Sequence, residues 1–150
     1  AAMDRRFAWT TPPGGPQSLP LFFLEDADAR PSAQRTSCHQ EIAADGVFAA
    51  AMLAEYRAPL EAFGPWLYRR LYWETGVVGQ VLYLEAEASG IRGTGIGCFF
   101  DDQTHQVFGL TGDGFQVLYH FTMGGAIDDP RLQTHPPYQH LARAQGGGDD

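Results

Sequence analysis

The stretch from Pro65 to Ser89 constrains the fold more than any other part of this sequence. It opens with Pro65, whose missing N–H costs nothing in the first turn of a helix. Gly90 follows the stretch, and glycine is favoured just after a helix because it accepts a positive φ. The sequence therefore predicts one continuous helix, about 37 Å long at a rise of 1.5 Å per residue.

The predicted helix is apolar on more than one face. Two neighbouring stripes run along it, one of Leu67, Leu71, Val78 and Leu82, the other of Tyr68, Tyr72, Gly79 and Tyr83. Between Leu71 and Leu84 the strongly polar residues are Glu74, Thr75 and Gln80. A helix that is apolar nearly all round is buried on most of its sides. We therefore expect a central helix or a subunit interface, with most of the helix surface buried.

A strand with alternating glycines follows the helix. Glycine occupies positions 93, 95 and 97 of the predicted strand 93–100. Residues two apart in a strand share a face, so this face is bare backbone over three positions. Glycine in a strand often marks the close approach of a ligand or of another backbone. Two interpretations stay open: a flat ring lies on the glycines, or the long helix packs tightly over them.

The remaining elements follow from apolar runs and turn residues. Residues 47–53 form an Ala-rich apolar run that propensity alone leaves open between helix and strand. A short helix is expected from a cap at Asp101 or Asp102 to Phe108, closed by Gly109. Other expected elements are a strand over 19–24, a helix over 32–44 and a strand over 115–123. Strands interspersed with helices predict an α+β fold.

The two ends of the chain differ in composition from the middle. Residues 1–18 are rich in proline and glycine and predict a linker, whereas residues 141–150 contain a Gly-Gly-Gly run and predict a disordered tail. The domain is then expected over 19–140. Because the chain opens on Ala1, we also expect it to be a piece of a longer protein.

Charge and hydropathy exclude two classes of function. The net charge is −8 and no Lys/Arg-rich run is present, so we expect no nucleic-acid partner. The longest apolar segment, 77–84, is far too short to cross a membrane, and no signal segment opens the chain. Only 19% of the residues are charged, which suggests that much of the surface is covered by something.

Cysteine and histidine give few signs of a metal or nucleophile site. Cys38 and Cys98 are expected to be free thiols in a reducing cytoplasm, with a disulfide as the open alternative. Cys98 is interpreted as a packing residue in preference to a nucleophile. His135 and His140 lack further ligands at zinc spacing, so we expect no metal site. The serines show no nucleophile elbow, so a hydrolase triad is not expected.

Several segments together resemble the nitroreductase superfamily. Residues 67–90 are similar to its central dimer helix, whose pattern G-x-x-x-Q-N-L-x-L-A-A-x-x-x-G is matched by Gly76 or Gly79, Gln80, Leu82, Leu84, Ala86 and Gly90. The segment 95–102 resembles the family's I-G-x-F-D with one extra phenylalanine. Further matches are the short-helix ending at 108–110, the closing strand at 121–125 and the segment 129–132. The resemblance covers roughly residues 38–138 and is strongest to the thiazole/oxazole-forming dehydrogenases and their relatives.

This resemblance implies a fold, a cofactor and a reaction. It implies a mixed sheet with a long central helix, incomplete at the N-terminus, and makes residues 47–53 a strand. It also implies FMN at a homodimer interface, or against a second nitroreductase-like half, with hydride transfer to or from a small molecule or peptide. The flavin N5 edge would face Gly95, Ile96, Gly97 and Cys98. The FMN phosphate would meet Arg131, which could equally be a solvated loop arginine.

The sequence departs from the family pattern in two places. The N-terminal Arg-Arg-Ser-x-Arg phosphate motif is absent, and Arg5-Arg6-Phe7 is followed by Trp and prolines instead of a helix. The azole-forming branch has a Lys-Tyr pair before the long helix, where this chain has Phe63-Gly-Pro-Trp66. These departures leave an alternative function open: a non-catalytic, degenerate or partial domain that serves dimerisation or substrate binding within a larger protein.

Overall fold

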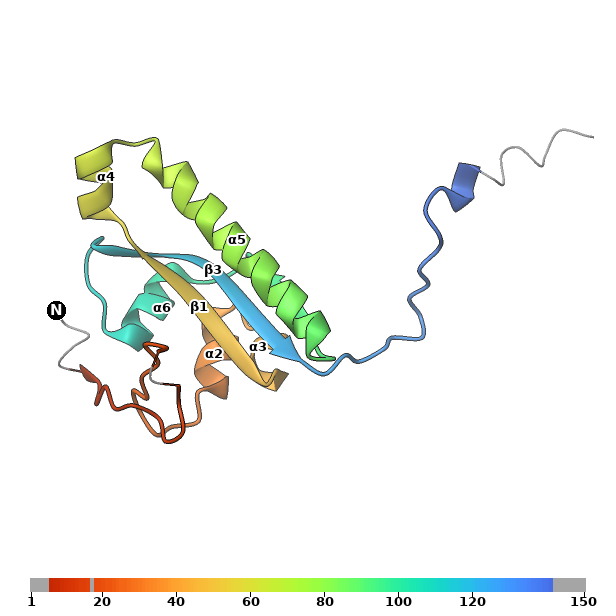
Figure 1. Ribbon diagram of the computed structural model, residues 1–150, viewed down its shortest axis with the longest axis horizontal. Helices are drawn as coiled ribbons and strands as arrows, with labels where there is room; N and C mark the ends of the chain where they lie inside the picture. Colours follow the sequence, from red (N-terminus) through yellow and green to blue (C-terminus); the bar gives the residue numbers. More distant parts are fainter. Residues whose placement is uncertain (1–5, 17, 142–150) are drawn as a thin grey trace, which may run out of the picture.

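The computed structural model describes residues 6–16 and 18–141, which form one antiparallel sheet between two layers of helices (Figure 1). In chain order the elements are α2 (Arg30–Thr36), α3 (Ile42–Asp45), β1 (Phe48–Glu55), α4 (Arg57–Phe63), α5 (Leu67–Ala88), β2 (Arg92–Ile96), α6 (Asp101–Phe108) and β3 (Phe115–Gly124). The expected α+β architecture with a long helix is confirmed.

The last of the described strands, β3, is the central strand of the sheet. The strand order is β1-β3-β2, and both pairs are antiparallel. Along β2 the register pairs Arg92 with Gly124 and Ile96 with His120. Along β1 it shifts by one residue between Met52 and Leu53, which marks a bulge.

Alternate residues of β3 serve the two helical layers. Phe121 is fully buried and clusters with Met123 and Ala86 of α5. On the opposite face His120 is buried beside Ser37, near the end of α2, and Thr104 of α6. The period-2 alternation of a strand therefore gives one apolar face under α5 and one face with polar contacts under the shorter helices.

Helix α5 is continuous but far less buried than expected. It runs unbroken over 22 residues, and Gly90 takes the predicted positive φ of 71° just beyond it. Its buried residues are Thr75, Gly79 and Ala86. Trp73 and Val77 are 66% and 65% exposed, so the expectation of burial on most sides is wrong for the single chain. The physical reason is that α5 lies outermost, with the sheet of its own chain on only one side (Figure 1).

Three other expectations need correction. Residues 19–24 form no strand but contribute Phe23 to an isolated bridge with Thr10. The predicted helix over 32–44 is two helices, α2 and α3, separated at Cys38 and His39, where φ is positive. Helix α4 is an additional element, which the sequence did not predict.

The segment around α6 is partly as predicted. Strand β2 ends at Ile96 instead of continuing to Phe100. Phe100 caps α6 in place of Asp101 or Asp102, which both lie in the first turn, where the helix dipole favours carboxylates. Gly109 closes the helix in the left-handed conformation, as predicted.

The two cysteines form a disulfide, so the expectation of free thiols is wrong. Cys38 and Cys98 are joined with their Cα atoms 5.9 Å apart. They lie 60 residues apart in the chain. The fold brings them together by packing the turn after α2 against the segment after β2, a juxtaposition that residue counts cannot reveal.

The boundaries of linker, domain and tail stay predictions. Residues 1–5 and 17 of the predicted linker, and residues 142–150 of the predicted tail, lie outside the described part of the chain. The described residues after β3 run away from the sheet as an extended segment (Figure 1).

Candidate functional site

The glycines of the 93–97 segment differ in what lies beside them. A Cβ at Gly93 would lie 2.8 Å from Cζ of Phe121, and a Cβ at Gly95 would overlap the hydroxyl of Tyr119. A Cβ at Gly97 would meet nothing within 4 Å. The packing interpretation therefore holds at the first two glycines, although the covering groups are mostly aromatic rings of β3. Open space remains beside the third.

Aromatic side chains form a continuous layer between β2 and α5. The rings of Tyr83 and Phe121 meet edge to face with centroids 4.9 Å apart. The Gly95 N–H donates a hydrogen bond of 2.7 Å to the Tyr83 hydroxyl. Burial, with the nearby Tyr83 as a smaller cause, raises the pKa of the Tyr119 hydroxyl above its usual value. The Tyr119 hydroxyl is therefore a neutral hydrogen-bonding group at ordinary pH.

A cleft runs between α5 and β3 beside this layer. Its volume is about 260 Å³, and its lining includes Gly76, Gly79, Gln80, Tyr83 and Tyr119. Gly79 lets the helix approach the strand, since a Cβ there would lie 3.1 Å from the Tyr119 ring. The cleft thus lies on the sheet-facing side of the predicted dimer helix, beside Gly76, Gly79 and Gln80, which match the family pattern.

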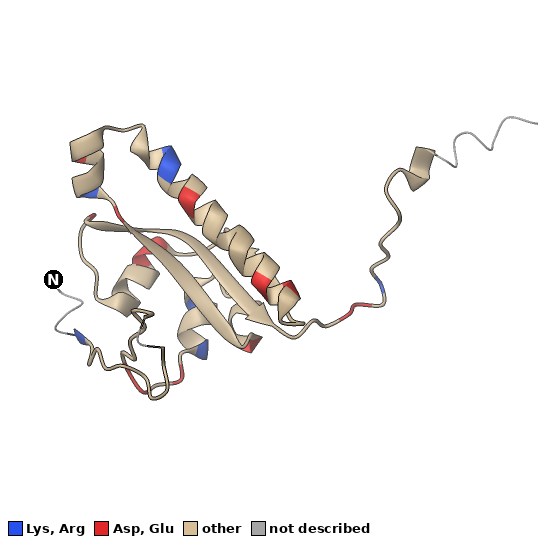
Figure 2. Cartoon of the chain, viewed as in Figure 1, with Lys and Arg blue, Asp and Glu red and all other residues tan. Residues whose placement is uncertain are grey.

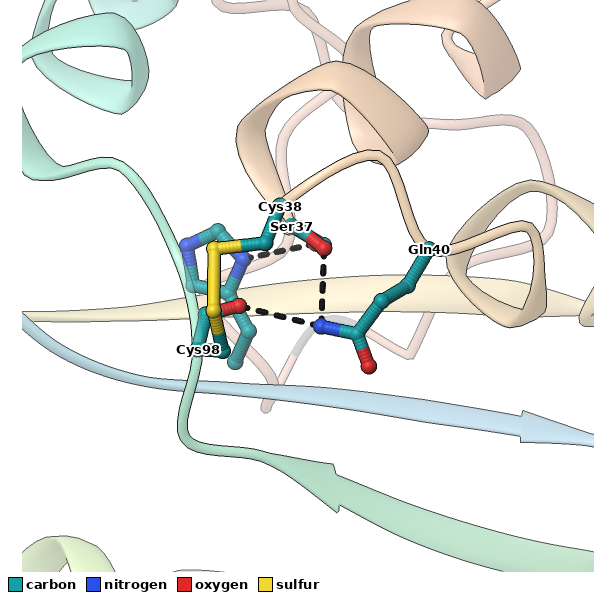
Figure 3. Close-up of a disulfide and its surroundings, with 5 residues drawn as sticks. Ser37, Cys38, Gln40 and Cys98 are labelled. Atoms are coloured by element: carbon teal, nitrogen blue, oxygen red, sulfur yellow. Dashed lines mark hydrogen bonds between the residues drawn. A yellow bond between two sulfur atoms is a disulfide. The ribbon is translucent and has the colours of Figure 1, made fainter.

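The segment after β2 is fastened to the turn after α2. The Gln40 side-chain amide donates to the carbonyl of Ser37 at 2.9 Å and to that of Cys98 at 3.1 Å (Figure 3). The Phe100 N–H donates to the Thr36 carbonyl at 2.8 Å. The Cys38–Cys98 disulfide adds a covalent link. These contacts fix where the chain goes after Gly97.

The buried side chain of His120 lies directly beneath the segment after β2. Its Nδ1 lies 2.9 Å from the Ser37 hydroxyl and its Nε2 lies 3.4 Å from the Thr104 hydroxyl. Phe99 stacks on the His120 ring with centroids 4.7 Å apart and the planes 10° from parallel. Burial lowers the pKa of His120, slightly offset by the charge of Asp101.

This histidine cluster is a packing and positioning device. A serine bonded to a histidine has the spacing of a nucleophile and its base. However, Ser37 is only 1% exposed, so no substrate carbonyl can reach its hydroxyl. Neutral His120 instead ties α2 and α6 to the centre of the sheet through its two ring nitrogens.

The structure does not bring Arg131 to the other predicted cofactor residues. Gly95, Ile96, Gly97 and Cys98 are contiguous at the end of β2. The chain leaves the sheet after Gly124, which pairs with Arg92 at the opposite end of β2. There the Arg131 side chain is 87% exposed and forms an ion pair of 2.6 Å with Asp129.

Sequence reasoning missed the aromatic layer and the histidine cluster. A signal for the first exists, because aromatic residues at 119 and 121 alternate on β3 with the same period as the glycines at 93 and 95 on β2. Aromatic rings commonly cover glycines on a neighbouring strand. No comparable signal marks His120, because its hydroxyl partners come from two distant helices.

A family model for the nitroreductase family matches residues 8–125. This match covers most of the chain. The chain belongs to the nitroreductase family. None of the helices in the described residues is both long and apolar enough to cross a lipid bilayer.

Solved nitroreductase structures share this fold. A protein from Anabaena variabilis assigned as a nitroreductase is 29% identical with a TM-score of 0.62, over 67% of this chain and 20% of that one. Nitroreductase A from Vibrio parahaemolyticus is 17% identical with a TM-score of 0.58, over 85% of this chain and 56% of that one. A protein from Exiguobacterium sibiricum was solved in complex with FMN and is assigned as a nitroreductase. It is 16% identical with a TM-score of 0.51, over 75% of this chain and 69% of that one.

The chain spans only part of these structures. It covers 20% of the Anabaena protein and 56% of the Vibrio enzyme. Among curated proteins, no relative matches it.

Proposed function

We propose that this chain is part of an FMN-dependent oxidoreductase of the nitroreductase type. The observation that carries the proposal is the open space beside Gly97 at the end of β2, in a chain of this family. A flat ring needs backbone without side chains beside it, and Gly97 is the glycine of the 93–97 segment that offers this. The residues at this end of β2 thus fit the flavin ring edge.

Each predicted cofactor residue has a distinct part in this proposal. Bound flavin would supply the hydride chemistry, while the protein supplies position and electrostatics. Gly97 leaves room for the ring, buried Ile96 anchors the strand end, and Cys98 is held in place by its disulfide. Gly95 contributes rigidity, since its N–H already donates to Tyr83. Arg131 would have to exchange its Asp129 partner for a phosphate.

We propose further that α5 packs against a second copy of this chain or a second nitroreductase-like half. Its middle, from residue 75 to residue 84, carries no charged side chain (Figure 2). Exposed apolar residues gather there and at its start, including Trp73, Val77, Val81 and Leu84. An exposed apolar face of this kind is expected to bury more than roughly 1,000 Å² of surface in an interface with a partner. Sedimentation that shows only monomer at micromolar concentration would contradict a homodimer.

The proposal leaves the substrate as a small molecule or peptide and does not extend to azole formation. No comparison supports the thiazole/oxazole branch, and the Lys-Tyr pair of that branch is absent before α5. A cytoplasmic location rests on the family resemblance alone. The Cys38–Cys98 disulfide is the observation that favours a more oxidising surrounding.

A non-catalytic role in dimerisation or substrate binding is the second candidate. Two observations favour it. The rings of Phe121 and Tyr119 already cover Gly93 and Gly95, and Arg131 lies at the other end of the strand. In this case the chain would keep the α5 face but bind no flavin.

Titration of the purified chain with FMN separates the two candidates. We expect flavin absorbance to stay with the protein after gel filtration. Gly97→Val should abolish this, because a β-branched side chain would project into the ring space. Arg131→Ala removes one charged contact and should weaken binding by about tenfold to a hundredfold.

Gly114→Val is the matched control, since a Cβ there also meets nothing within 4 Å and the residue lies outside the proposed site. It should retain FMN. A Gly97→Val variant that binds FMN like Gly114→Val would overturn the site assignment. A wild-type chain that binds no FMN would favour the non-catalytic role.

A further inference from the structure

The Cys38–Cys98 disulfide lies where a dissolved thiol can reach it. Cys98 is exposed and Cys38 is half-buried, so the bond is not enclosed in the core. Figure 3 shows it bridging the turn after α2 and the segment after β2, with Gln40 beside it. A thiolate can displace one sulfur of a disulfide only if it can approach along the bond, so exposure of Cys98 is the first requirement for exchange.

The backbone at Cys38 has an uncommon conformation. Cys38 and His39 have φ values of 54° and 59°, two successive non-glycine residues in the left-handed region. Side chains rarely adopt this conformation, and it persists where the surroundings impose it. The turn is therefore held by its surroundings, which include the crosslink and the two hydrogen bonds from Gln40 to the Ser37 carbonyl.

Non-covalent contacts also hold the segment after β2. They are the Gln40 amide to the Cys98 carbonyl, the Phe100 N–H to the Thr36 carbonyl, the ring contact of His39 with Phe100 at 5.8 Å, and the stack of Phe99 on the buried His120 ring at 4.7 Å. Partly exposed hydrogen bonds contribute little net stability, because water replaces them. Of these contacts, the Gln40 amide reaches residue 98 itself, whereas the others hold Phe99 and Phe100. The crosslink is thus the covalent restraint on where residues 97 and 98 lie.

We propose that Cys38–Cys98 is a redox-active disulfide that exchanges with dithiols, and that its reduction releases the segment after β2. A dithiol thiolate attacks Sγ of Cys98, the S–S bond breaks, and Cys38 leaves as a thiolate that takes up a proton. The second thiol of the reagent, as a thiolate, attacks its own sulfur in the mixed disulfide and releases Cys98. Two electrons pass from the dithiol, which becomes a cyclic disulfide, to the protein.

The consequence for cofactor binding rests on the proposed function. Gly97 immediately precedes Cys98, so the crosslink also fixes the backbone that would face the flavin. With the bond formed, the site is preorganised, and with the bond reduced, the segment must be ordered again on binding. The redox state of this pair would then set the affinity for FMN.

The first experiment counts thiols and needs no flavin. The oxidised chain is incubated with dithiothreitol under native conditions and labelled with a maleimide that shifts its mass. We expect two labelled cysteines per chain while the far-ultraviolet circular dichroism stays unchanged. Two results would overturn the proposed exchange. One is that the cysteines are labelled only in denaturant, and the other is that glutathione disulfide fails to re-form the disulfide in the reduced chain.

Hydrogen exchange then tests the release. Reduction should speed exchange at Phe100 by on the order of tenfold or more, because its N–H bond to Thr36 belongs to the released segment. Amides of the β1–β3 ladder should keep their rates. Unchanged exchange at Phe100, or faster exchange throughout β3, would overturn a local release.

Gln40→Ala is the control for the hydrogen bonds. It removes the amide contact with Cys98 and keeps the disulfide, so Phe100 should exchange nearly as slowly as in the oxidised wild type. If this variant matches the reduced wild type, the crosslink is not what holds the segment, and the proposal fails.

Flavin affinity is the last arm of the test. The Cys38→Ser/Cys98→Ser variant should bind FMN about tenfold more weakly than the oxidised wild type, about what ordering one residue costs. Equal affinity would overturn the link between redox state and cofactor. Absence of FMN binding in every form would defeat the proposed function but leave the exchange to be judged by the labelling.

Discussion

Two glycines at opposite ends of β2 have different surroundings. Gly93, near the start of the strand, lies under the buried ring of Phe121. A Cβ at Gly97, just past the end of the strand, would meet no atom within 4 Å. The first region is held by packing with β3 and α5. The second is held by a disulfide, a glutamine amide, one backbone hydrogen bond and the stack of Phe99 on His120. The same residue type therefore serves close packing in one region and accessibility in the other, and only the neighbouring strand and turn decide which.

Removing the covalent restraint on the open region should have the largest effect on stability. A link across 60 residues restricts the unfolded chain, so Cys38→Ser/Cys98→Ser should lose up to about 4 kcal/mol of unfolding free energy. Urea denaturation without reductant measures this. Wild type in excess dithiothreitol is the matched control and should unfold with the variant. A variant that unfolds together with the oxidised wild type would show that the link does not restrict the unfolded chain.

A methyl group in the packed region should have the next largest effect. Gly93→Ala forces a Cβ against Phe121, which is fully buried and has no room to move, at a cost of roughly 1–3 kcal/mol. The free energy of unfolding from urea titration is the measurement. A neutral result would mean that the ring layer over β2 is looser than the contacts imply.

Acidification should destabilise the layer beneath the fastened segment. Because burial lowers the pKa of folded His120 below its unfolded value of about 6.5, the unfolded chain binds more protons below that pH. Stability should therefore fall as the pH drops below about 6.5, by at most about 1.4 kcal/mol per pH unit, until the lower folded pKa is passed.

His120→Gln is the control for this pH dependence, because glutamine does not titrate. Melting temperatures between pH 7 and pH 5 should decline less in the variant than in the wild type. The exposed carboxylates with lowered pKa, Asp28, Asp113 and Asp129, act in a separate window below about pH 4. Parallel declines in both proteins would assign the effect to other groups.

The smallest effect is expected at the open glycine. Gly97→Ala adds a methyl group where nothing contacts it, and it restricts the unfolded chain, so stability should rise by about 0.4–1 kcal/mol. The same urea titration used for Gly93→Ala gives the contrast. Equal losses at both positions would remove the distinction between the two regions.

The sequence predicted elements whose signals are local. The continuity of α5, the end of α6 at Gly109 and the position of β3 follow from apolar periodicity and glycine caps. Features that depend on tertiary contacts were missed or wrong. Helix 32–44 breaks at Cys38 because that turn meets a segment 60 residues away, and α5 is exposed because only one of its sides faces the sheet.

The candidate site was predictable to a similar degree. The alternating glycines identified the strand, and the structure adds which of them are covered. The sequence predicted Gly95, Ile96, Gly97 and Cys98 along one strand, but β2 ends at Ile96, and Gly97 and Cys98 lie just beyond it. Their role toward FMN, like that of Arg131, stays a prediction.

The strand order also has a consequence for biosynthesis. β3 follows β1 and β2 in the chain, yet both β1 and β2 pair only with it among the described strands. Phe48 of β1 finds its partner Met123 across 75 residues, so the nascent chain holds an unpaired apolar strand until translation has passed residue 115. Long-range pairing of this kind slows folding and prolongs exposure to aggregation. Slow decoding of the codons between β2 and β3 would lengthen that interval.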